Sequence, residues 1–195
     1  MLWNGRDFEG WTFYLNPPKS GEAVDPMNVW SIRDGAIHCL GAPNGYMRTL
    51  ADYTNYKLHV EWRWVPDPER AKGRNSGVLL HMSEPEAIWP KSIEAQLMAG
   101  NAGDFFVIGG TTVKELDPGP EGKNRRVAKM GESAEKEIGE WNEYDILCKG
   151  DTIEVRVNGE LKNRGTQASV QAGKICLQSE GAPIEFRNVY IEPAE

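Results

Sequence analysis

The fold class is decided by the stretch Ser92-Ile93-Glu94-Ala95-Gln96-Leu97-Met98. Apolar and polar residues alternate along it, so a β-strand would place its apolar side chains on one face of a sheet and Glu94 and Gln96 on the other. One acid and one amide then stand together on an open polar surface. Strands with the same division occur before and after this one, which predicts that polar side chains from several strands gather in a groove.

The composition favours one all-β domain over residues 1–195. A chain of 195 residues is long enough for a single domain of two packed layers. Its 21 glycines and 12 prolines interrupt the chain too often for long helices, and apolar residues recur at period two far more often than at three or four. Short strands separated by turn residues are typical of a sandwich or jelly roll rather than a small barrel.

Two dipeptides predict tight hairpins within this domain. Asp34-Gly35 and Asn158-Gly159 each lie between alternating runs, which is the strongest short-range signal for a type I′ turn. Between residues 111 and 140 the alternation dissolves into a mixture of charged residues, glycine and proline. We expect this segment to form a long charged loop, and long loops over a sheet often enclose a ligand.

Charge and hydropathy restrict the partners. The net charge of -7 and the pI near 5.1 oppose binding to nucleic acid and give no general attraction to anionic membranes. No run of about 18 apolar residues predicts a transmembrane helix. Residues 1–4 lack the basic and apolar regions of a signal peptide, so the sequence as it stands is expected to be soluble. A periplasmic or secreted location stays open, because removal of a leader would leave the same sequence.

The cysteines and histidines do not form a recognisable metal motif. Cys39, Cys148 and Cys176 are isolated, each within an apolar or alternating context, and we expect buried free thiols. Neither a Cys-x-x-Cys nor a His-x-x-x-His pair occurs, so a structural zinc site has no support. Binding of a divalent metal ion by isolated ligands remains open.

Residues 56–65 form a long predicted strand with a second polar face. His59, Glu61 and Arg63 share this face, opposite two tryptophans and two aliphatic residues. One interpretation is that Glu61 and Arg63 belong to the polar groove. The alternative is a cross-strand charge ladder, in which each pair contributes only about 0–1 kcal/mol.

A histidine and a further acid and amide pair complete the candidates. His81 interrupts the apolar strand at 77–82, either as an imidazole bonded to a backbone carbonyl or as an acid, base or metal ligand at the groove floor. Gln178 and Glu180 repeat at spacing two the polar pairing of the first stretch. Asn75 and Ser76 form a polar turn at the expected groove edge.

Nine segments, in order along almost the whole chain, resemble the 3-keto-disaccharide hydrolase family. They are Leu2-Trp3-Asn4-Gly5-Arg6-Asp7-Phe8-Glu9-Gly10-Trp11, the hairpin 30–37, Glu61-Trp62-Arg63, Asn75-Ser76-Gly77-Val78, Ile93-Glu94-Ala95-Gln96, Trp141-Asn142, Val157-Asn158-Gly159, Leu177-Gln178-Ser179-Glu180-Gly181 and Phe186-Arg187-Asn188-Val189. The resemblance implies a concanavalin-like jelly roll of two curved antiparallel sheets. It also implies a carbohydrate-cleaving site on the concave face, and relatives often carry secretion signals that this sequence lacks.

The chemistry implied by this family fits an incomplete set of carboxylates. Retaining glycosidases of similar architecture need two carboxyl groups about 5 Å apart, whereas Glu94 is the only acid on its strand. A 3-keto sugar can instead be cleaved by elimination and hydration, which needs a base, an acid and a group that stabilises the enolate. By residue type, Glu94, His81 and Arg63 fit these catalytic roles. The expected substrate-binding residues are Glu61, Asn75, Ser76, Gln96, Gln178 and Glu180.

Two other classes of function remain as alternatives. A non-catalytic carbohydrate-binding module would use the same fold and the same polar face for recognition alone. A purely structural adhesion domain would show no shared orientation of these groups. The sequence leaves open the sugar, the linkage and the oligomeric state.

Overall fold

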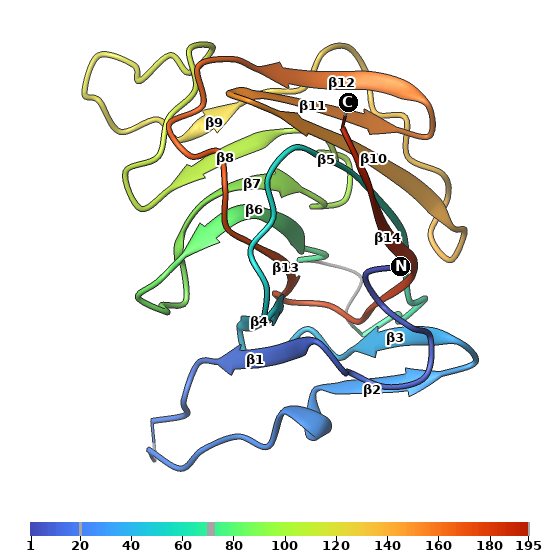
Figure 1. Ribbon diagram of the computed structural model, residues 1–195. Coiled ribbons are helices and arrows are strands. Elements are labelled where there is room, and N and C mark those ends of the chain that lie inside the picture. The colour runs from blue at the N-terminus through green and yellow to red at the C-terminus, as the bar shows by residue number, and fades with distance from the viewer. Residues whose placement is uncertain (20, 70–72, 195) are drawn as a thin grey trace.

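Two antiparallel sheets of seven strands each make up the fold in the computed structural model (Figure 1). The structure describes residues 1–19, 21–69 and 73–194. The first sheet, called sheet A, contains in spatial order β1 (Trp11–Leu15), β4 (Gly45–Thr49), β13 (Lys174–Ser179), β6 (Gly77–Ser83), β7 (Lys91–Gln96), β8 (Phe105–Ile108) and β9 (Arg126–Val127). The second, sheet B, contains β12 (Glu160–Gly165), β11 (Thr152–Val157), β10 (Asn142–Lys149), β5 (Tyr56–Trp64), β14 (Ile184–Pro193), β3 (Ala36–Cys39) and β2 (Trp30–Arg33). The all-β prediction is confirmed.

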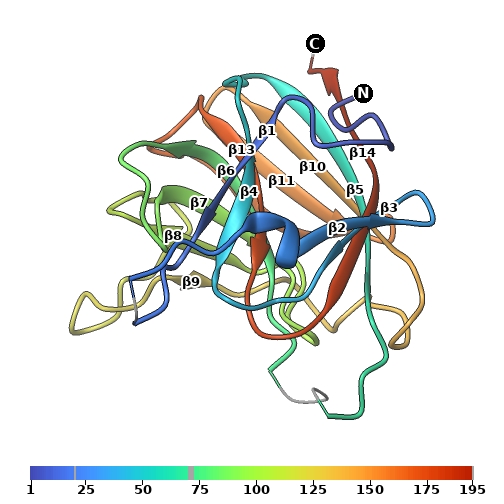
Figure 2. The ribbon, with the colours of Figure 1, turned by 90° about the horizontal axis from the view of Figure 1, so that it is seen from below.

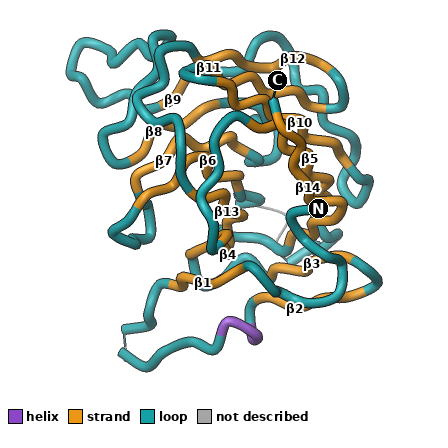
Figure 3. Tube along the Cα trace, in the orientation of Figure 1, coloured by secondary structure: helices purple, strands orange, loops and turns teal. Residues whose placement is uncertain are grey.

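Irregular structure connects these strands. Within the described residues the only helical element is a short 3-10 helix, η1 (Pro26–Asn28), between β1 and β2 (Figure 3). Asp25 caps it by accepting a hydrogen bond of 2.9 Å from the backbone N–H of Met27. Between residues 111 and 140, where a long charged loop was expected, the two-residue strand β9 is the only regular element described. No described helix combines the length and the apolar character needed to cross a membrane.

The core lies between the two sheets, which are seen as separate layers in Figure 2. Strand β5 shows how alternation builds it, because Leu58, Val60 and Trp62 are buried while the residues between them are partly exposed. The Trp62 ring lies 5.2 Å from the ring of Tyr144 on β10. Burial of each such side chain contributes about 1.5–3 kcal/mol, so this layer stabilises both sheets.

Both predicted hairpins are present. Asp34-Gly35 joins β2 to β3, and Asn158-Gly159 joins β11 to β12. All four turn residues have positive φ angles, between 49° and 84°, as a type I′ turn requires. The three cysteines are free and buried, as expected, and burial raises the pKa of the Cys39 and Cys148 thiols to about 12.

The outer face of sheet A carries a small apolar cluster of its own. Tyr46, Leu79, Met82 and Cys176 are fully buried there, and Tyr14 stacks on Tyr46 with ring centroids 5.5 Å apart. In contrast, the polar residues of β7 and β13 occupy the neighbouring part of the same face. The apolar cluster therefore closes one side of the polar region and limits it to the strands around β7.

Candidate functional site

Strand β7 holds Glu94 and Gln96 on the outer face of sheet A, as their alternation predicts. Glu94 lies opposite Leu79 of β6, and Gln96 lies opposite Gly77. Directly opposed residues of antiparallel strands project to the same side, so these positions share one surface. Gln178 of β13 joins them from the other side of β6. All three polar side chains are at least 95% buried, with Glu94 5% exposed, Gln96 4% and Gln178 1%.

Gly77 leaves the space in which two of these side chains meet. A Cβ atom at this position would collide with Oε1 of Glu94 and would lie 2.5 Å from Oε1 of Gln178. Both side chains therefore cross the backbone of β6 at its only residue without a side chain. A glycine inside a strand often marks such a close approach.

Several polar atoms at this point have no hydrogen-bonding partner among the described residues. They are Oε1 of Glu94, both side-chain polar atoms of Gln178 and Oδ1 of Asn75. Leaving a buried polar atom unpaired costs about 1–3 kcal/mol, so native structures rarely gather several without a use. This convergence is typical of a site that binds a ligand rich in hydroxyl and carbonyl groups.

Two carboxyl groups, Glu94 and Glu180, share the site, and the pKa of each is raised. Burial raises the pKa of Glu94 to about 8, and the charge of Glu180 adds to this rise. Burial also raises the pKa of Glu180, but a hydrogen bond with Asn75 acts in the opposite direction. Glu94 therefore keeps its proton at neutral pH, and of the two groups Glu180 has the hydrogen bond that favours the ionised form.

A groove of about 460 Å³ opens over these groups. Its polar wall is formed by Asn75, Glu94, Gln96 and Glu180. Its apolar wall includes Phe106, directly opposite Glu94, and Trp89, which is 45% exposed. The groove thus combines buried polar groups with aromatic surface, as sugar-sized pockets require.

Gln96 and Ser76 are held by the backbone. Oε1 of Gln96 accepts hydrogen bonds from the N–H groups of Leu97 at 2.9 Å and Met98 at 2.8 Å. The Ser76 hydroxyl is buried and donates to the carbonyl of Gln178 at 2.9 Å. Gln96 still lines the groove, whereas Ser76 and Gln178 are not among the groove residues. Ser76 joins the start of β6 to β13, and Gln178 lies beneath the groove beside Glu94.

His81 lies away from the groove, and its predicted place beside Glu94 is wrong. The pairing of β6 with β7 shifts between Leu80 and Ser83, and His81 has a φ angle of 54°. This bulge breaks the alternation, so the imidazole lies 5.6 Å from the ring of Tyr56 in the space between the sheets. Its Nδ1 atom is 3.2 Å from the carbonyl oxygen of Val170, and burial lowers its pKa. His81 therefore matches the alternative interpretation from the sequence, in which its imidazole is bonded to a backbone carbonyl.

Arg63 and Glu61 also lie outside the groove, because β5 belongs to sheet B. The guanidinium of Arg63 pairs with Glu185 at 2.7 Å, and Glu61 pairs with Arg187 at 2.6 Å. Arg187 and Arg63 are the residues directly opposite Glu61 and Glu185 in the β5–β14 register. The alternative of a cross-strand charge ladder is therefore confirmed, and the expectation that these residues meet Glu94 is wrong.

Gly77, Phe106 and Arg125 belong to the site but were not predicted from the sequence. Gly77 had a readable signal, since it interrupts an apolar strand directly after a polar turn. Phe106 and Arg125 had none, because their proximity to Glu94 depends on the order of strands β7, β8 and β9. No group of three or more His, Cys, Asp or Glu side chains suited to a metal occurs within the part of the chain that the structure describes.

This combination of a two-sheet jelly roll and a polar groove defines a carbohydrate-active, glycosyl hydrolase-like domain. Residues 1–192 match the family model described as a 3-keto-alpha-glucoside-1,2-lyase-like domain. The chain therefore belongs to this 3-keto-disaccharide hydrolase family. A comparison with curated proteins found no match.

Solved structures with the same fold include enzymes and a binding module. A candidate glycosyl hydrolase from Parabacteroides distasonis ATCC 8503 is 25% identical, with a TM-score of 0.66, and the match covers 100% of this chain and 93% of that one. A second from the same organism is 20% identical, with a TM-score of 0.61 and coverage of 94% and 98%. The carbohydrate-binding module CBM66 from Bacillus subtilis is 12% identical, with a TM-score of 0.64 and coverage of 95% and 97%. The latter two likenesses show the fold alone.

The Glu94→Gln variant should be more stable than the parent protein in alkaline solution. The unfolded chain releases the Glu94 proton near pH 4.5 and the folded protein near pH 8, so the parent loses stability as the pH rises through this window. Glutamine cannot ionise, and we expect a gain of about 1–3 kcal/mol at pH 8 that vanishes below pH 4.5. Chemical denaturation at several pH values measures it.

Glu61→Gln provides the matched control for this measurement. Bonds to Asn188 and Arg187 lower the pKa of Glu61, so its charged form stabilises the fold and its loss should destabilise the protein at pH 8. A Glu94→Gln variant whose stability difference from the parent is the same at pH 4 and pH 8 would contradict the assignment.

Proposed function

We propose that this chain cleaves the glycosidic bond of 3-keto glycosides by elimination followed by hydration in the groove of sheet A. The observation that carries this proposal is the convergence of buried, unpartnered polar atoms of Glu94, Gln178 and Asn75 beside the Glu180 carboxylate. Membership of the family and the likeness to a candidate glycosyl hydrolase support a sugar substrate.

The ketone of such a substrate makes elimination accessible to a carboxylate base. A carbonyl group at C3 acidifies the hydrogen on C2, and Glu180 takes this proton to leave an enolate. The guanidinium group of Arg125, which lines the groove, stabilises the negative charge that develops on the C3 oxygen. When the C3 carbonyl re-forms, a double bond forms between C2 and C1, and the bond from C1 to the leaving oxygen breaks. Glu94 gives its proton to that oxygen.

Hydration then completes the reaction and restores both acids. Water adds to C1 of the unsaturated ketone, and the Glu94 carboxylate accepts a proton from this water. Glu180 returns its proton to C2. The net reaction consumes one water molecule and breaks one glycosidic bond, so it is a hydrolysis without any covalent intermediate on the protein.

The electrostatics of the groove assign the acid and the base. Glu94 remains protonated at neutral pH because of its burial and the neighbouring charge, which suits the group that donates to the leaving oxygen. Glu180 is less buried and is bonded to Asn75, which favours its ionised form. Arg63 and His81, the candidates from residue type, are replaced in this scheme by Arg125 and Glu180.

The first experiment compares a 3-keto glucoside with its unoxidised parent. We expect release of the leaving group only from the keto compound, because only its C2 hydrogen is acidic enough for a carboxylate. Reducing-sugar release is followed for both substrates, with and without a chelator. Faster cleavage of the unoxidised parent would contradict the elimination. Loss of turnover with chelator would assign enolate stabilisation to a divalent ion instead of Arg125.

Glu94→Gln should reduce turnover of the keto substrate by at least about 100-fold, since a positioned general acid contributes about 10²–10⁴-fold. Affinity for the substrate should remain, because the amide has the same shape. The matched variant Glu61→Gln, on the opposite sheet, should turn over within about threefold of the parent. Equal losses in the two variants would show that the defect is structural and would remove Glu94 from the mechanism.

Gly77→Ala tests the close approach in the groove. The added methyl group would displace the Glu94 and Gln178 side chains, which are flexible at their ends, so we expect a folded protein with turnover at least about tenfold lower. Steady-state kinetics and a thermal melt measure the two effects. Ser83→Ala, at the other end of the same strand, serves as the control. Unchanged turnover in Gly77→Ala would mean that the two side chains are not needed where they lie.

A carbohydrate-binding module without catalytic activity is the second candidate. It is favoured by the fold shared with CBM66 of Bacillus subtilis, whose name describes a binding module. The Glu94→Gln variant separates the two functions. Retained affinity with lost turnover supports the enzyme, whereas binding of glycans without turnover in the parent protein supports the module.

A further inference from the structure

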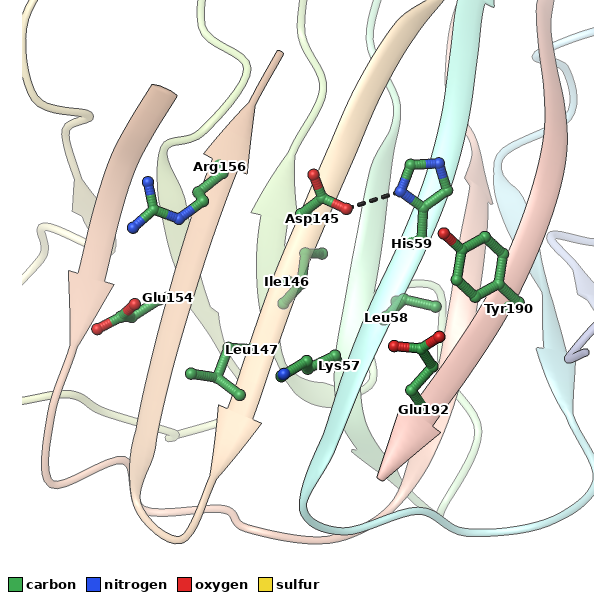
Figure 4. Close-up of a pocket in the computed structure, with 10 residues that line it drawn as sticks. All are labelled: Lys57, Leu58, His59, Asp145, Ile146, Leu147, Glu154, Arg156, Tyr190 and Glu192. Carbon is green, nitrogen blue, oxygen red and sulfur yellow. Dashed lines mark hydrogen bonds and ion pairs between the residues drawn. The ribbon is translucent and has the colours of Figure 1, made fainter. Parts of the chain in front are cut away.

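A second hollow lies on the outer face of sheet B, on the side of the molecule opposite the groove. It has a volume of about 330 Å³, and its side chains come from β14, β5, β10 and β11 (Figure 4). None of the residues that line it lines the groove of sheet A. Its chemistry is therefore independent of the proposed catalytic reaction.

Strand register arranges the outward side chains of this hollow in two rows across four strands. The first row consists of Tyr190, His59, Asp145 and Arg156. The second row consists of Glu192, Lys57, Leu147 and Glu154. Leu147 is shorter than its neighbours and uncharged, so the second row has an apolar floor between long polar side chains (Figure 4).

Three members of the first row, Tyr190, His59 and Asp145, contact one another. The rings of His59 and Tyr190 stack with centroids 4.8 Å apart and an interplanar angle of 23°. Nδ1 of His59 lies 2.7 Å from Oδ1 of Asp145. A bulge in β14, where Asn188 has a φ angle of 49°, brings Tyr190 to the outer face directly opposite His59. The Tyr190 ring and the Asp145 carboxylate therefore already lie at the border of the hollow before a ligand binds.

The second row offers free hydrogen-bonding capacity. Lys57 and Glu192 are directly opposed in register and both are exposed, yet neither forms an ion pair with a described residue. They present an ammonium donor and a carboxylate acceptor side by side above Leu147. Adjacent donors and acceptors beside an apolar surface match the alternating hydroxyl groups and C–H bonds of a sugar ring.

The balance of charge argues against an ionic ligand. Lys57 and Arg156 stand among three acids, of which Glu154 pairs with Arg164 of β12 at 3.4 Å. With Arg164 included, three lysine or arginine side chains face three acidic side chains. A ligand with a net charge would gain little here, whereas a neutral polyol could bond to groups of both signs.

We propose that this hollow binds a neutral sugar unit of a glycan as a second, non-catalytic site. Such a site would hold a glycan chain on sheet B while the groove of sheet A acts on another part of it or on a separate molecule. The apolar floor of Leu147 and the edge of Tyr190 contact the ring, and Lys57 and Glu192 bond to its hydroxyl groups.

Amide chemical-shift mapping tests this site directly. The folded chain is titrated separately with cellobiose, maltose and sophorose as neutral probes. We expect at least one of them to shift the backbone amides of Lys57, Leu147 and Tyr190 in a saturable manner. Tyr190→Ala and Leu147→Asp should each weaken this binding about tenfold or more, which equals the loss of one good contact. Leu50→Asp, at an exposed leucine outside the hollow, should leave it unchanged.

Three outcomes would overturn the proposal. The first is the absence of shifts at these amides with all three disaccharides. The second is binding that survives Leu147→Asp unchanged, since the floor would then not contact the sugar. The third is that glucuronate or glucosamine shifts these amides at lower concentration than the three neutral disaccharides do, which would indicate recognition of charge. Loss of turnover in Glu94→Gln leaves these measurements unaffected, so this proposal and the catalytic one fail separately.

Discussion

The close approach of two polar side chains over Gly77 is the constraint on which the groove depends. Glu94 and Gln178 come from strands on either side of β6, and they can meet only because the residue between them has no side chain. Their meeting buries the carboxyl group, and burial keeps it protonated at neutral pH. A single missing Cβ atom thus sets both the geometry and the protonation state that the proposed chemistry uses.

The same strand that carries the site also stabilises the fold that holds it. Ile93 and Ala95 of β7 are fully buried between the sheets, while Glu94 is turned to the groove. Unpaired buried polar atoms in the groove cost about 1–3 kcal/mol each, and the apolar residues on the inner face of the same strands offset this cost. The site is therefore fixed by the core beneath it rather than by bonds among its own polar groups.

The sequence predicted which face of a strand carries a side chain better than it predicted which strands lie side by side. Alternation alone placed Glu94, Gln96 and Gln178 correctly, because side-chain direction along a strand has a fixed period. It failed for His81, where one extra residue in a bulge reverses the direction, and no local signal in an apolar strand announces a bulge. Alternation predicted the wrong position for Arg63. A period of two shows which residues share one face of a strand, but it does not show to which sheet the strand belongs. Strand order depends on contacts between segments distant in sequence, such as β13 beside both β4 and β6.

In this molecule, structural residues differ from site residues in whether their polar groups have partners, rather than in residue type. On sheet B, Glu61 and Arg63 resemble catalytic residues, but each is paired with the oppositely charged residue directly across from it in β14. Such pairs hold their charges in place and leave little capacity for a ligand. At and beneath the groove of sheet A, polar atoms of Glu94 and Gln178 lack partners although they are buried. A charged group that is already ion-paired stabilises the surface. A buried polar group without a hydrogen-bonding partner in the chain is available to bind a ligand.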